Sequence, residues 1–327
     1  MYKIGYYVNN HGTGHTNRLF CFIKQLETLN LNYKLFIFAE DLNKIVNLGF
    51  SLDKIELVQL GKPNWSLEKK HMIFHSLPKN YKQYFKPIVE TCIKESIQTF
   101  VSDLSVEVGL AVRLHVDRLV YILLHGERID DAHQAIFFES DILIVPFSEV
   151  LEDWYLKDFK LDFNLVYSGG FLKFQYQTQP EFFPKDYSKE KKNILIILGT
   201  GGDNFNKDYI DVDTNEYNVI VLGKDRFENP YNYIRCADVV VANAGDSILH
   251  EIAYFNKPYI CIPENRPFAE QEIKADTLER EGFALISNWN YSLKDDLENL
   301  KQQKDKGVLI QNDKARLFTQ QVLGFKR

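Results

Sequence analysis

The sequence predicts an α/β protein built from two doubly wound domains that face each other across a cleft. Short apolar runs typical of buried strands alternate with segments of helical periodicity, which favours parallel sheets covered by helices on both faces. This alternation breaks near Val166–Gly170 and then restarts. The chain of 327 residues also exceeds the usual size of a single core, so two domains are expected.

The predicted first domain spans residues 1–170 and opens with the apolar run Ile4–Val8. Further strands are predicted from apolar runs bounded by polar or turn residues, at Lys34–Ala39, Ile55–Leu60, Thr99–Asp103, Arg118–Leu124 and Asp141–Pro146. Helical patterns lie between these runs, at Leu19–Leu29, Asn43–Leu48, Tyr81–Thr99 and Ser105–His115.

The predicted second domain spans residues 171–327 and follows a connection rich in proline and charge, Tyr176–Lys192. Its strands are predicted at Asn193–Leu198, Tyr217–Leu222, Asp238–Ala242, Pro258–Ile262 and Phe283–Ile286, with helices over 246–255 and Ala269–Glu281. The charged end, Leu293–Arg327, is predicted to be helical, and its last helix is a candidate to pack back on the first domain.

Composition excludes several classes of function. The net charge of −6 argues against nucleic acid as a partner of the whole protein. No run approaches 18 apolar residues, and the N-terminus begins a strand rather than a signal peptide. Four cysteines show neither a CxxC pair nor the spacing of a disulfide framework. A cytoplasmic protein with reduced thiols is therefore expected.

A glycine turn joins the first predicted strand to the first predicted helix, and it reads His11-Gly12-Thr13-Gly14-His15 with Arg18 one turn later. Its two glycines permit positive φ and a close approach of a ligand to the backbone. His15 is expected at the mouth of this turn, where an imidazole exchanges a proton near neutral pH.

Two further turns, Gly199–Gly202 and Gly245–Ser247, follow strands in the second half. Free backbone N–H groups and a helix dipole favour a phosphate at such turns, although each alone also fits an ordinary tight loop. Glu251 follows Ser247 by one helical turn, where its carboxylate can accept hydrogen bonds from sugar hydroxyls. Together these features indicate a nucleotide.

This part of the chain resembles the donor domain of GT-B glycosyltransferases, which pair two Rossmann-like domains. The branch it resembles contains the lipid II-forming N-acetylglucosaminyltransferase and the UDP-glycosyltransferases. The likeness covers residues 1–20 and about 195–290, and it rests on Gly12-x-Gly14-His15-x2-Arg18, Gly245-x-Ser247-x3-Glu251, Lys257-Pro258, Ile262-Pro263, Glu270-Gln271-x3-Ala275 and Glu281-Gly282.

The resemblance implies a role for each matched position. Glu251 would bind the ribose, and the segment around Phe227 would clasp the base. Glu270 and Gln271 would contact hydroxyls of the donor sugar. The diphosphate would be held by four residues of the two turns, Gly201, Gly202, Gly245 and Ser247.

Two positions depart from the pattern of that branch. Lys274 stands where the branch often has Asn, and Asp246 puts a carboxylate in the phosphate turn. One interpretation of Asp246 is that it points outward and favours the helix N-terminus.

The resemblance also implies an inverting transfer in which His15 is the general base and Asp103 fixes its tautomer. An equally open alternative makes Asp103 the N-cap of the next helix. No cofactor is expected beyond a nucleotide-diphosphate sugar as co-substrate, because helix N-termini can stabilise the leaving diphosphate. No metal is expected either, since the pair His71 and His75 lacks clear further ligands. The segment His125–Arg128 ends a predicted strand and could line the cleft, but the preferred interpretation is a polar loop.

The expected acceptor is a glycan or a lipid-linked sugar of the cell envelope. Between Lys62 and Lys94, lysines are interleaved with aromatic residues, which suggests an anionic membrane surface and a peripheral location on the inner membrane face. The alternative is a solvated helix whose aromatic side chains face the core.

Two other functions fit the same residues. In a nucleotide-sugar hydrolase His15 would activate water in a closed pocket, whereas a transferase needs an open channel beside it. A catalytically silent protein would bind the nucleotide sugar without turnover. A nicotinamide dehydrogenase is disfavoured because the first turn lacks Gly-x-Gly-x2-Gly.

Overall fold

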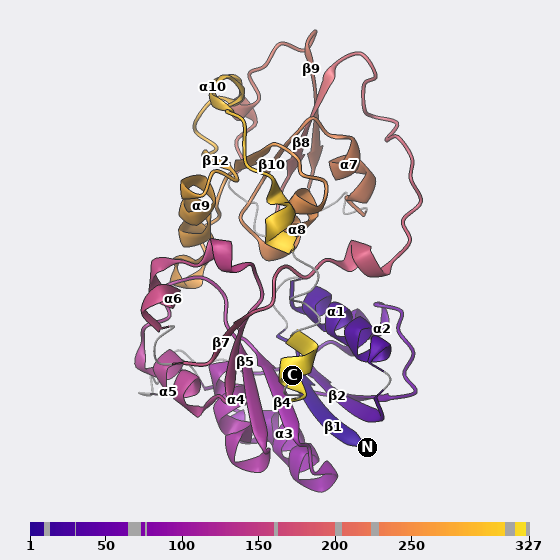
Figure 1. Ribbon diagram of the computed structural model, residues 1–327, viewed down its shortest axis with the longest axis vertical. Coiled ribbons are helices and arrows are strands. Elements are labelled where there is room, and N and C mark those ends of the chain that lie inside the picture. Colours follow the sequence, from indigo (N-terminus) through magenta and orange to yellow (C-terminus); the bar gives the residue numbers. More distant parts are fainter. Residues whose placement is uncertain are drawn as a thin grey trace.

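The computed structural model describes residues 1–9, 14–29, 31–64, 73–75, 77–159, 163–199, 205–223, 229–310 and 318–324. Figure 1 shows two α/β domains stacked along the long axis, with the N-terminal domain below the C-terminal one. The expected architecture of two parallel-sheet domains is confirmed.

The N-terminal domain contains a seven-stranded parallel sheet in the order β3-β2-β1-β4-β5-β6-β7. Its strands are β1 (Tyr2–Tyr7), β2 (Tyr33–Ala39), β3 (Ile55–Gln59), β4 (Thr99–Asp103), β5 (Arg118–Ile122), β6 (Ile142–Val145) and β7 (Leu165–Tyr167). Its helices are α1 (Gly14–Thr28), α2 (Leu42–Val46), α3 (Tyr81–Glu95), α4 (Val106–Val112), α5 (Asp131–Glu139) and α6 (Trp154–Phe159). Because β1 pairs with β4, the loops after these two strands open at the same edge of the sheet.

The C-terminal domain contains a five-stranded parallel sheet in the order β12-β11-β10-β8-β9. Its strands are β8 (Lys192–Ile197), β9 (Tyr217–Leu222), β10 (Val239–Ala242), β11 (Tyr259–Cys261) and β12 (Leu285–Ile286). Its helices are α7 (Tyr231–Cys236), α8 (Asp246–Tyr254), α9 (Glu270–Arg280) and α10 (Leu293–Asn299). Short 3-10 helices occur in both domains, at Arg113–His115, Glu149–Leu151, Lys173–Tyr176, Lys207–Tyr209, Pro267–Ala269 and Lys306–Ile310.

Buried apolar side chains explain why the predicted strands form. The last four residues of β1 and all four residues of β6 are buried, as expected for a sheet that helices cover on both faces. α1 turns Leu19, Phe22 and Leu26 toward this core. Four elements, β7, α5, α6 and α7, were not predicted from the sequence, because they are nine residues or shorter and give little periodic signal.

The end of the chain is helical only in part, so the prediction for Leu293–Arg327 is wrong as a continuous helix. α10 begins after its N-cap Ser292 and ends at Asn299. Beyond it, the Gln303 side chain donates to the Tyr259 carbonyl oxygen at 2.7 Å and accepts from the Tyr259 N–H at 2.9 Å. This segment therefore supplies hydrogen-bond partners to the backbone N–H and C=O groups at the start of β11 instead of extending a helix.

The last described segment, 318–324, packs on the N-terminal domain beside its sheet (Figure 1). The Phe318 ring is fully buried, with its centroid 5.3 Å from that of Phe22 and 5.2 Å from that of Phe171. The Thr319 hydroxyl donates to the Gln25 side chain, and Arg118 donates to the Gln321 carbonyl oxygen at 3.1 Å. The chain thus returns to the domain in which it began.

The segment Lys62–Lys94 differs from the expectation of an aromatic, basic surface. Tyr84 and Phe85 lie on α3 and are buried in the N-terminal core, which contradicts that expectation for these two rings. Tyr81 on the same helix is exposed, and Trp65, Lys69 and Lys70 lie outside the described residues. Among the residues that the structure describes, no helix is long and apolar enough to span a membrane.

Candidate active site at the domain interface

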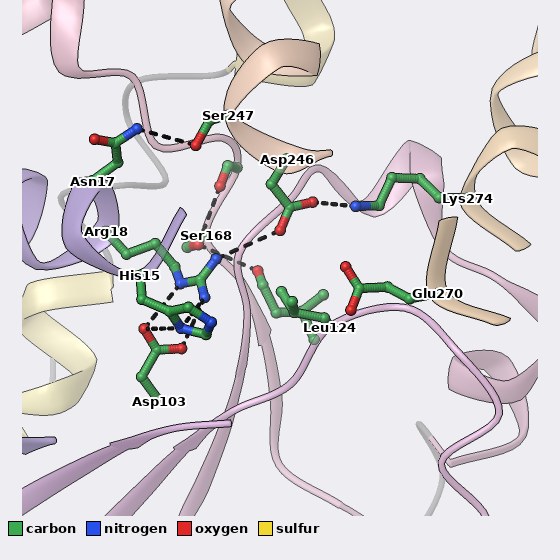
Figure 2. Close-up of polar contacts among 12 residues, drawn as sticks. His15, Asn17, Arg18, Asp103, Leu124, Ser168, Asp246, Ser247, Glu270 and Lys274 are labelled. Atoms are coloured by element: carbon green, nitrogen blue, oxygen red, sulfur yellow. Dashed lines mark hydrogen bonds and ion pairs between the residues drawn. The ribbon is translucent and has the colours of Figure 1, made fainter. Parts of the chain in front are cut away.

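His15, Arg18 and Asp103 form a buried cluster where α1 begins (Figure 2). His15 Nδ1 lies 3.0 Å from Asp103 Oδ2 and 2.9 Å from Arg18 Nη2. Arg18 also donates two hydrogen bonds to the Asp103 carboxylate, at 2.9 and 3.3 Å. The Asp103 side chain is fully buried, whereas that of His15 is 8% exposed.

The N-cap of α4 excludes one of the two predicted roles of Asp103. Helix α4 is N-capped by Ser105, whose hydroxyl accepts from the Val108 N–H at 3.2 Å, so the alternative in which Asp103 is the cap is wrong. Leu104 between them adopts a positive φ of 65°, a conformation that non-glycine residues seldom adopt outside constrained sites. The chain therefore turns sharply after β4, and the Asp103 carboxylate is left to pair with α1.

The charge of Asp103 is held by its neighbours. Burial alone would raise the pKa of this carboxyl, but the Arg18 guanidinium and His15 outweigh burial and hold the pKa below its usual range. Asp103 is thus an anion at neutral pH. The Asp103 carboxylate favours a proton on His15 Nδ1, which leaves Nε2 as the basic atom, whereas Arg18 Nη2 can only donate to the same Nδ1 and favours the opposite tautomer.

The N-terminus of α1 meets the N-terminus of α8 across the two domains. The Asn17 side chain donates to the Ser247 hydroxyl at 3.1 Å, and Arg18 Nη1 lies 3.5 Å from Asp246 Oδ2. A Cβ atom built on Gly14 would lie 3.7 Å from Arg18 Nη1 and 3.8 Å from Ser247 Oγ, which are ordinary contact distances, so Gly14 lies directly between the two helix ends without being required there by space. Gly12 lies outside the described residues.

Asp246 does not point outward, so that interpretation is wrong. Its carboxylate pairs with the Lys274 ammonium from α9 as well as with Arg18 from α1 (Figure 2). The Lys274 side chain is 0% exposed, and a buried ammonium requires such a partner. The departures at Asp246 and Lys274 are thus two halves of one ion pair.

The turn before α8 is held by side chains of the C-terminal domain. Gly245 is the N-cap residue, and its N–H donates to Asn243 Oδ1 at 3.0 Å. Asn243 in turn donates to Glu264 at 2.8 Å. Gly199 fits beside this pair, because a Cβ there would lie 2.2 Å from Asn243 Nδ2. Three other residues expected at the donor, Gly201, Gly202 and Phe227, lie outside the described residues.

Glu270 and Gln271 begin α9 and have different surroundings. The Gln271 side-chain oxygen accepts from the Ala244 N–H at 3.2 Å and from the Glu264 N–H at 2.9 Å. This amide therefore braces the turn before α8 in addition to any contact with a sugar. Glu270 instead faces the N-terminal domain, where Arg128 donates to it at 3.3 Å.

Glu251 lies one turn along α8 from Ser247, and its side chain is partly buried. Burial raises the pKa of its carboxyl to about 8, although the charge of Lys173 acts in the opposite direction. Such a carboxyl is mostly protonated at neutral pH, and hydrogen-bond donors that approach it would favour its ionised form.

Comparisons with known proteins identify the class of protein. Residues 168–323 match the family model described as the glycosyltransferase family 28 C-terminal domain. The chain is a GT-B glycosyltransferase. Among curated proteins no match is found.

Several solved structures share the fold of this glycosyltransferase over nearly its whole length. MurG from Acinetobacter baumannii is 14% identical with a TM-score of 0.60, and the alignment covers 99% of each chain. A UDP-glucose:anthocyanidin 3-O-glucosyltransferase in complex with UDP is 11% identical with a TM-score of 0.65, covering 98% of this chain and 93% of that one. The glycotransferase of kitacinnamycin is 13% identical with a TM-score of 0.63 and the same coverage.

In the loop His125–Arg128, His125, Gly126 and Arg128 are buried while Glu127 is exposed, so the loop lies at the domain interface, and the preferred interpretation as a plain polar loop is wrong for these three residues. The His125 ring stacks on Phe147 with centroids 3.6 Å apart, and burial lowers the pKa of this imidazole to about 3. Arg128 lies over the Phe268 ring, with its guanidinium carbon 4.8 Å from the ring centroid. These three residues are buried because the C-terminal domain of the glycosyltransferase covers them.

A histidine cluster missed by the sequence analysis lies beside Arg128 in the glycosyltransferase. Donor atoms of His75, Asp130 and His133 lie within 4.8 Å of one another, so His75 does have neighbours of metal-ligand type. His133 Nδ1 lies 2.6 Å from Asp130 Oδ2, while Arg128 Nη1 lies 3.3 Å from His133 Nε2. An arginine can only donate, so Nε2 accepts and Nδ1 carries the proton toward Asp130. His75 Nε2 also lies 2.8 Å from Asp130 Oδ1 and 3.1 Å from His133 Nδ1, so short polar contacts join all three side chains.

Sequence separation hides most of the residues that shape this interface. Asn17 and Ser247 are 230 positions apart, and Arg128 and Glu270 are 142 apart. The only feature of the sequence that pointed to the Lys274–Asp246 ion pair was that both residues depart from the family pattern. Lys274 replaces the expected asparagine, and Asp246 puts a carboxylate in the phosphate turn.

Proposed function

We propose that this glycosyltransferase moves a sugar from a nucleotide-diphosphate sugar, with UDP as the nucleotide, to a hydroxyl group of a glycan or lipid-linked acceptor. The transfer is inverting and independent of a metal ion, and His15 is the general base. The single observation that supports this most is the pairing of His15 with Asp103 at the end of α1 that faces the N-terminus of α8.

The proposed chemistry follows from that arrangement. His15 keeps one proton on Nδ1 toward Asp103, and its Nε2 atom takes the proton of the acceptor hydroxyl as the oxygen attacks the anomeric carbon. Asp103 then stabilises the imidazolium. Attack from the side opposite the diphosphate inverts the configuration of the anomeric carbon. The departing diphosphate gains charge at the N-terminus of α8, whose free N–H groups stabilise it.

One of the solved structures that share the fold supports a nucleotide sugar as the donor. The anthocyanidin glucosyltransferase that shares the fold is described as a complex with UDP. Glu251, in the partly buried position on α8, is the proposed ribose ligand, and Glu270 is the proposed ligand of the sugar hydroxyls.

One observation favours a second candidate function, a nucleotide-sugar hydrolase. The His15 side chain is only 8% exposed, which suits activation of a water molecule better than entry of a bulky acceptor. The two reactions differ in the oxygen that attacks the anomeric carbon. In hydrolysis this oxygen comes from water and the product is a free sugar, whereas in transfer it comes from the acceptor and forms the new glycosidic bond.

The test is a screen of nucleotide sugars for UDP release with and without acceptor glycans. We expect release to require an acceptor and to continue in EDTA, with an inverted anomeric centre in the product by NMR. His15→Ala should lower turnover about 10²–10⁴-fold while UDP affinity is kept. Full-rate release without acceptor would favour the hydrolase. If turnover is unchanged in His15→Ala, His15 is not the general base.

We also propose that α3 brings the enzyme to an anionic membrane when the acceptor is lipid-linked. Its exposed side chains include Lys82, Lys86, Ile93 and Lys94, which combine positive charge with an apolar group. Co-sedimentation with phosphatidylglycerol vesicles should fall when Lys82, Lys86 and Lys94 are changed to Glu. Equal sedimentation of wild type and variant would reject this docking.

A further inference from the structure

Asp246 is the first residue of α8, and two cations from different domains share its carboxylate. Lys274 approaches from α9 in the same domain, and Arg18 lies 3.5 Å away on α1 of the other domain. Asp246 is 10% exposed, Lys274 0% and Arg18 4%, counted over their side chains. This carboxylate therefore bridges the two domains in a nearly dry environment.

Two helix N-termini converge on the same point. α1 begins at Gly14 and has 15 residues, and α8 begins at Asp246 and has 9 residues. The Asn17–Ser247 hydrogen bond joins their first turns (Figure 2). Each N-terminus carries about half a positive charge from the helix dipole. The two helix dipoles thus attract an anion in addition to the attraction from the Arg18 and Lys274 side chains.

The side-chain charges of this region balance. Arg18 and Lys274 supply two positive charges, and Asp103 and Asp246 supply two negative ones. Burial opposes the ionisation of Asp246, but Lys274 and Arg18 outweigh it and hold the pKa of this carboxyl well below its usual range. Asp246 is accordingly ionised at neutral pH, and a diphosphate that arrives meets cations already paired.

We infer that Asp246 is an internal counter-ion that holds Arg18 and Lys274 in the empty enzyme and yields both cations to the diphosphate of the donor. The inference rests on the proposed function, since it requires a nucleotide diphosphate as ligand. When the diphosphate binds, its oxygens accept the hydrogen bonds of Lys274 and Arg18, and the Asp246 carboxylate turns away. Because Arg18 belongs to the N-terminal domain, the same exchange ties that domain to the donor.

The first test replaces Asp246 by Asn, which keeps an acceptor oxygen for Lys274 and removes the competing charge. UDP and uridine are titrated by calorimetry into wild-type and variant protein. Asp246→Asn should bind UDP roughly 10-fold or more tightly, the range expected for charge-assisted hydrogen bonds, while uridine affinity stays the same. The matched control is Asp276→Asn, which removes one exposed carboxylate from α9 and should change neither affinity.

The second test removes the cation. Lys274→Met should weaken UDP binding roughly 10-fold or more and leave uridine binding unchanged. The double variant Asp246→Asn/Lys274→Met contains no unpaired buried charge, so it remains informative even where the single lysine variant does not fold. We expect the double variant to lose the gain in UDP affinity that Asp246→Asn produces.

The outcomes separate this inference from the proposed function. An unchanged ratio of UDP to uridine affinity in Asp246→Asn would overturn the inference and reduce Asp246 to a structural ion pair. A gain that survives in the double variant would overturn it as well, because Lys274 would not be the released cation. If wild-type protein binds none of UDP, ADP, GDP, CDP or dTDP, the proposed function itself fails.

Discussion

His15 Nδ1 lies 3.0 Å from Asp103 Oδ2, although 88 positions separate the two residues in the sequence. The pair meets because β1 and β4 are neighbours in the sheet, so the loops after them open at one edge. Arg18 shares the same carboxylate, which makes Asp103 a counter-ion as well as the partner of an imidazole.

The dual role of Asp103 gives a prediction about non-additivity. Asp103→Asn should lower turnover about 10²–10⁴-fold, because the amide no longer holds the His15 proton on Nδ1. In a His15→Ala background the same change should lower turnover little further, since the two side chains act as one unit. Steady-state kinetics of the three variants measure this. Multiplicative losses in the double variant would show that the residues act independently.

Asp103→Asn should also be costly for stability. It leaves the Arg18 guanidinium buried without its bidentate partner, and breaking a buried pair costs about 3–5 kcal/mol. Urea denaturation of Asp103→Asn and of Arg18→Met/Asp103→Asn tests this. The double variant should recover part of the lost free energy of unfolding, because it removes the guanidinium together with its bidentate partner. No recovery would contradict the assignment of the loss to Arg18.

Glu251 should make stability depend on pH. Its pKa is about 8 in the fold against an ordinary value of 4.5, so the folded state binds the proton more tightly than the unfolded state. The free energy of unfolding should therefore be largest below the ordinary value and fall as pH rises toward about 8. Thermal melts across this range should show the fall in wild type and a flatter profile in Glu251→Gln. Identical pH profiles of wild type and Glu251→Gln would show that Glu251 does not cause the pH dependence of stability.

The same carboxyl should release a proton when a nucleotide binds. Ribose hydroxyls donate hydrogen bonds, so they favour the ionised form of Glu251, which is mostly protonated at pH 7 given a pKa of about 8. Calorimetry of UDP binding in buffers of different ionisation enthalpy counts the protons released. Wild type should release a proton that Glu251→Gln does not. Equal proton release from both proteins would place the ribose elsewhere.

Arg128 should affect recognition of the sugar more than that of the nucleotide. It donates to Glu270 from the other domain and thereby orients the carboxylate proposed to bind sugar hydroxyls. Arg128→Met should raise the KM for the nucleotide sugar roughly tenfold, whereas the Kd for UDP should stay the same. Arg113→Met, which removes an arginine paired with Glu139 and Asp141 on the surface, is the control. Parallel changes in KM and Kd would contradict a role specific to the sugar.

The sequence carried enough information for the fold and for one side of the site. Apolar runs located the longer strands within a few residues, because a buried parallel strand needs nearly continuous apolar side chains. His15 lies beyond the end of one predicted strand and Asp103 is the last residue of another, so sheet order alone can bring them together. Short elements such as β7 and α6 gave no comparable signal, because their burial depends on partners far along the chain.

The contacts across the domains were beyond the sequence because they depend on how the two domains are oriented. Nothing in a local pattern sets the angle at which α1 meets α8, so Asn17–Ser247 and Arg18–Asp246 had no basis for prediction. The direction of Asp246 was misjudged for the same reason. Helix-dipole reasoning favours a solvent-facing carboxylate, whereas a buried lysine on α9 requires a counter-ion.

Phe318 should stabilise the N-terminal domain although it lies near the end of the chain. Its buried ring fits between Phe22 on α1 and Phe171, so Phe318→Ala removes an aromatic side chain from the core and leaves a cavity. Core substitutions of this kind cost about 3–5 kcal/mol. Urea denaturation followed by circular dichroism measures the loss, and amide exchange in α1 should accelerate because that helix lines the cavity. Gln320→Ala, a change at a partly exposed position two residues later, is the control and should have little effect. If Phe318→Ala were as stable as this control, the C-terminal segment would not belong to the N-terminal core.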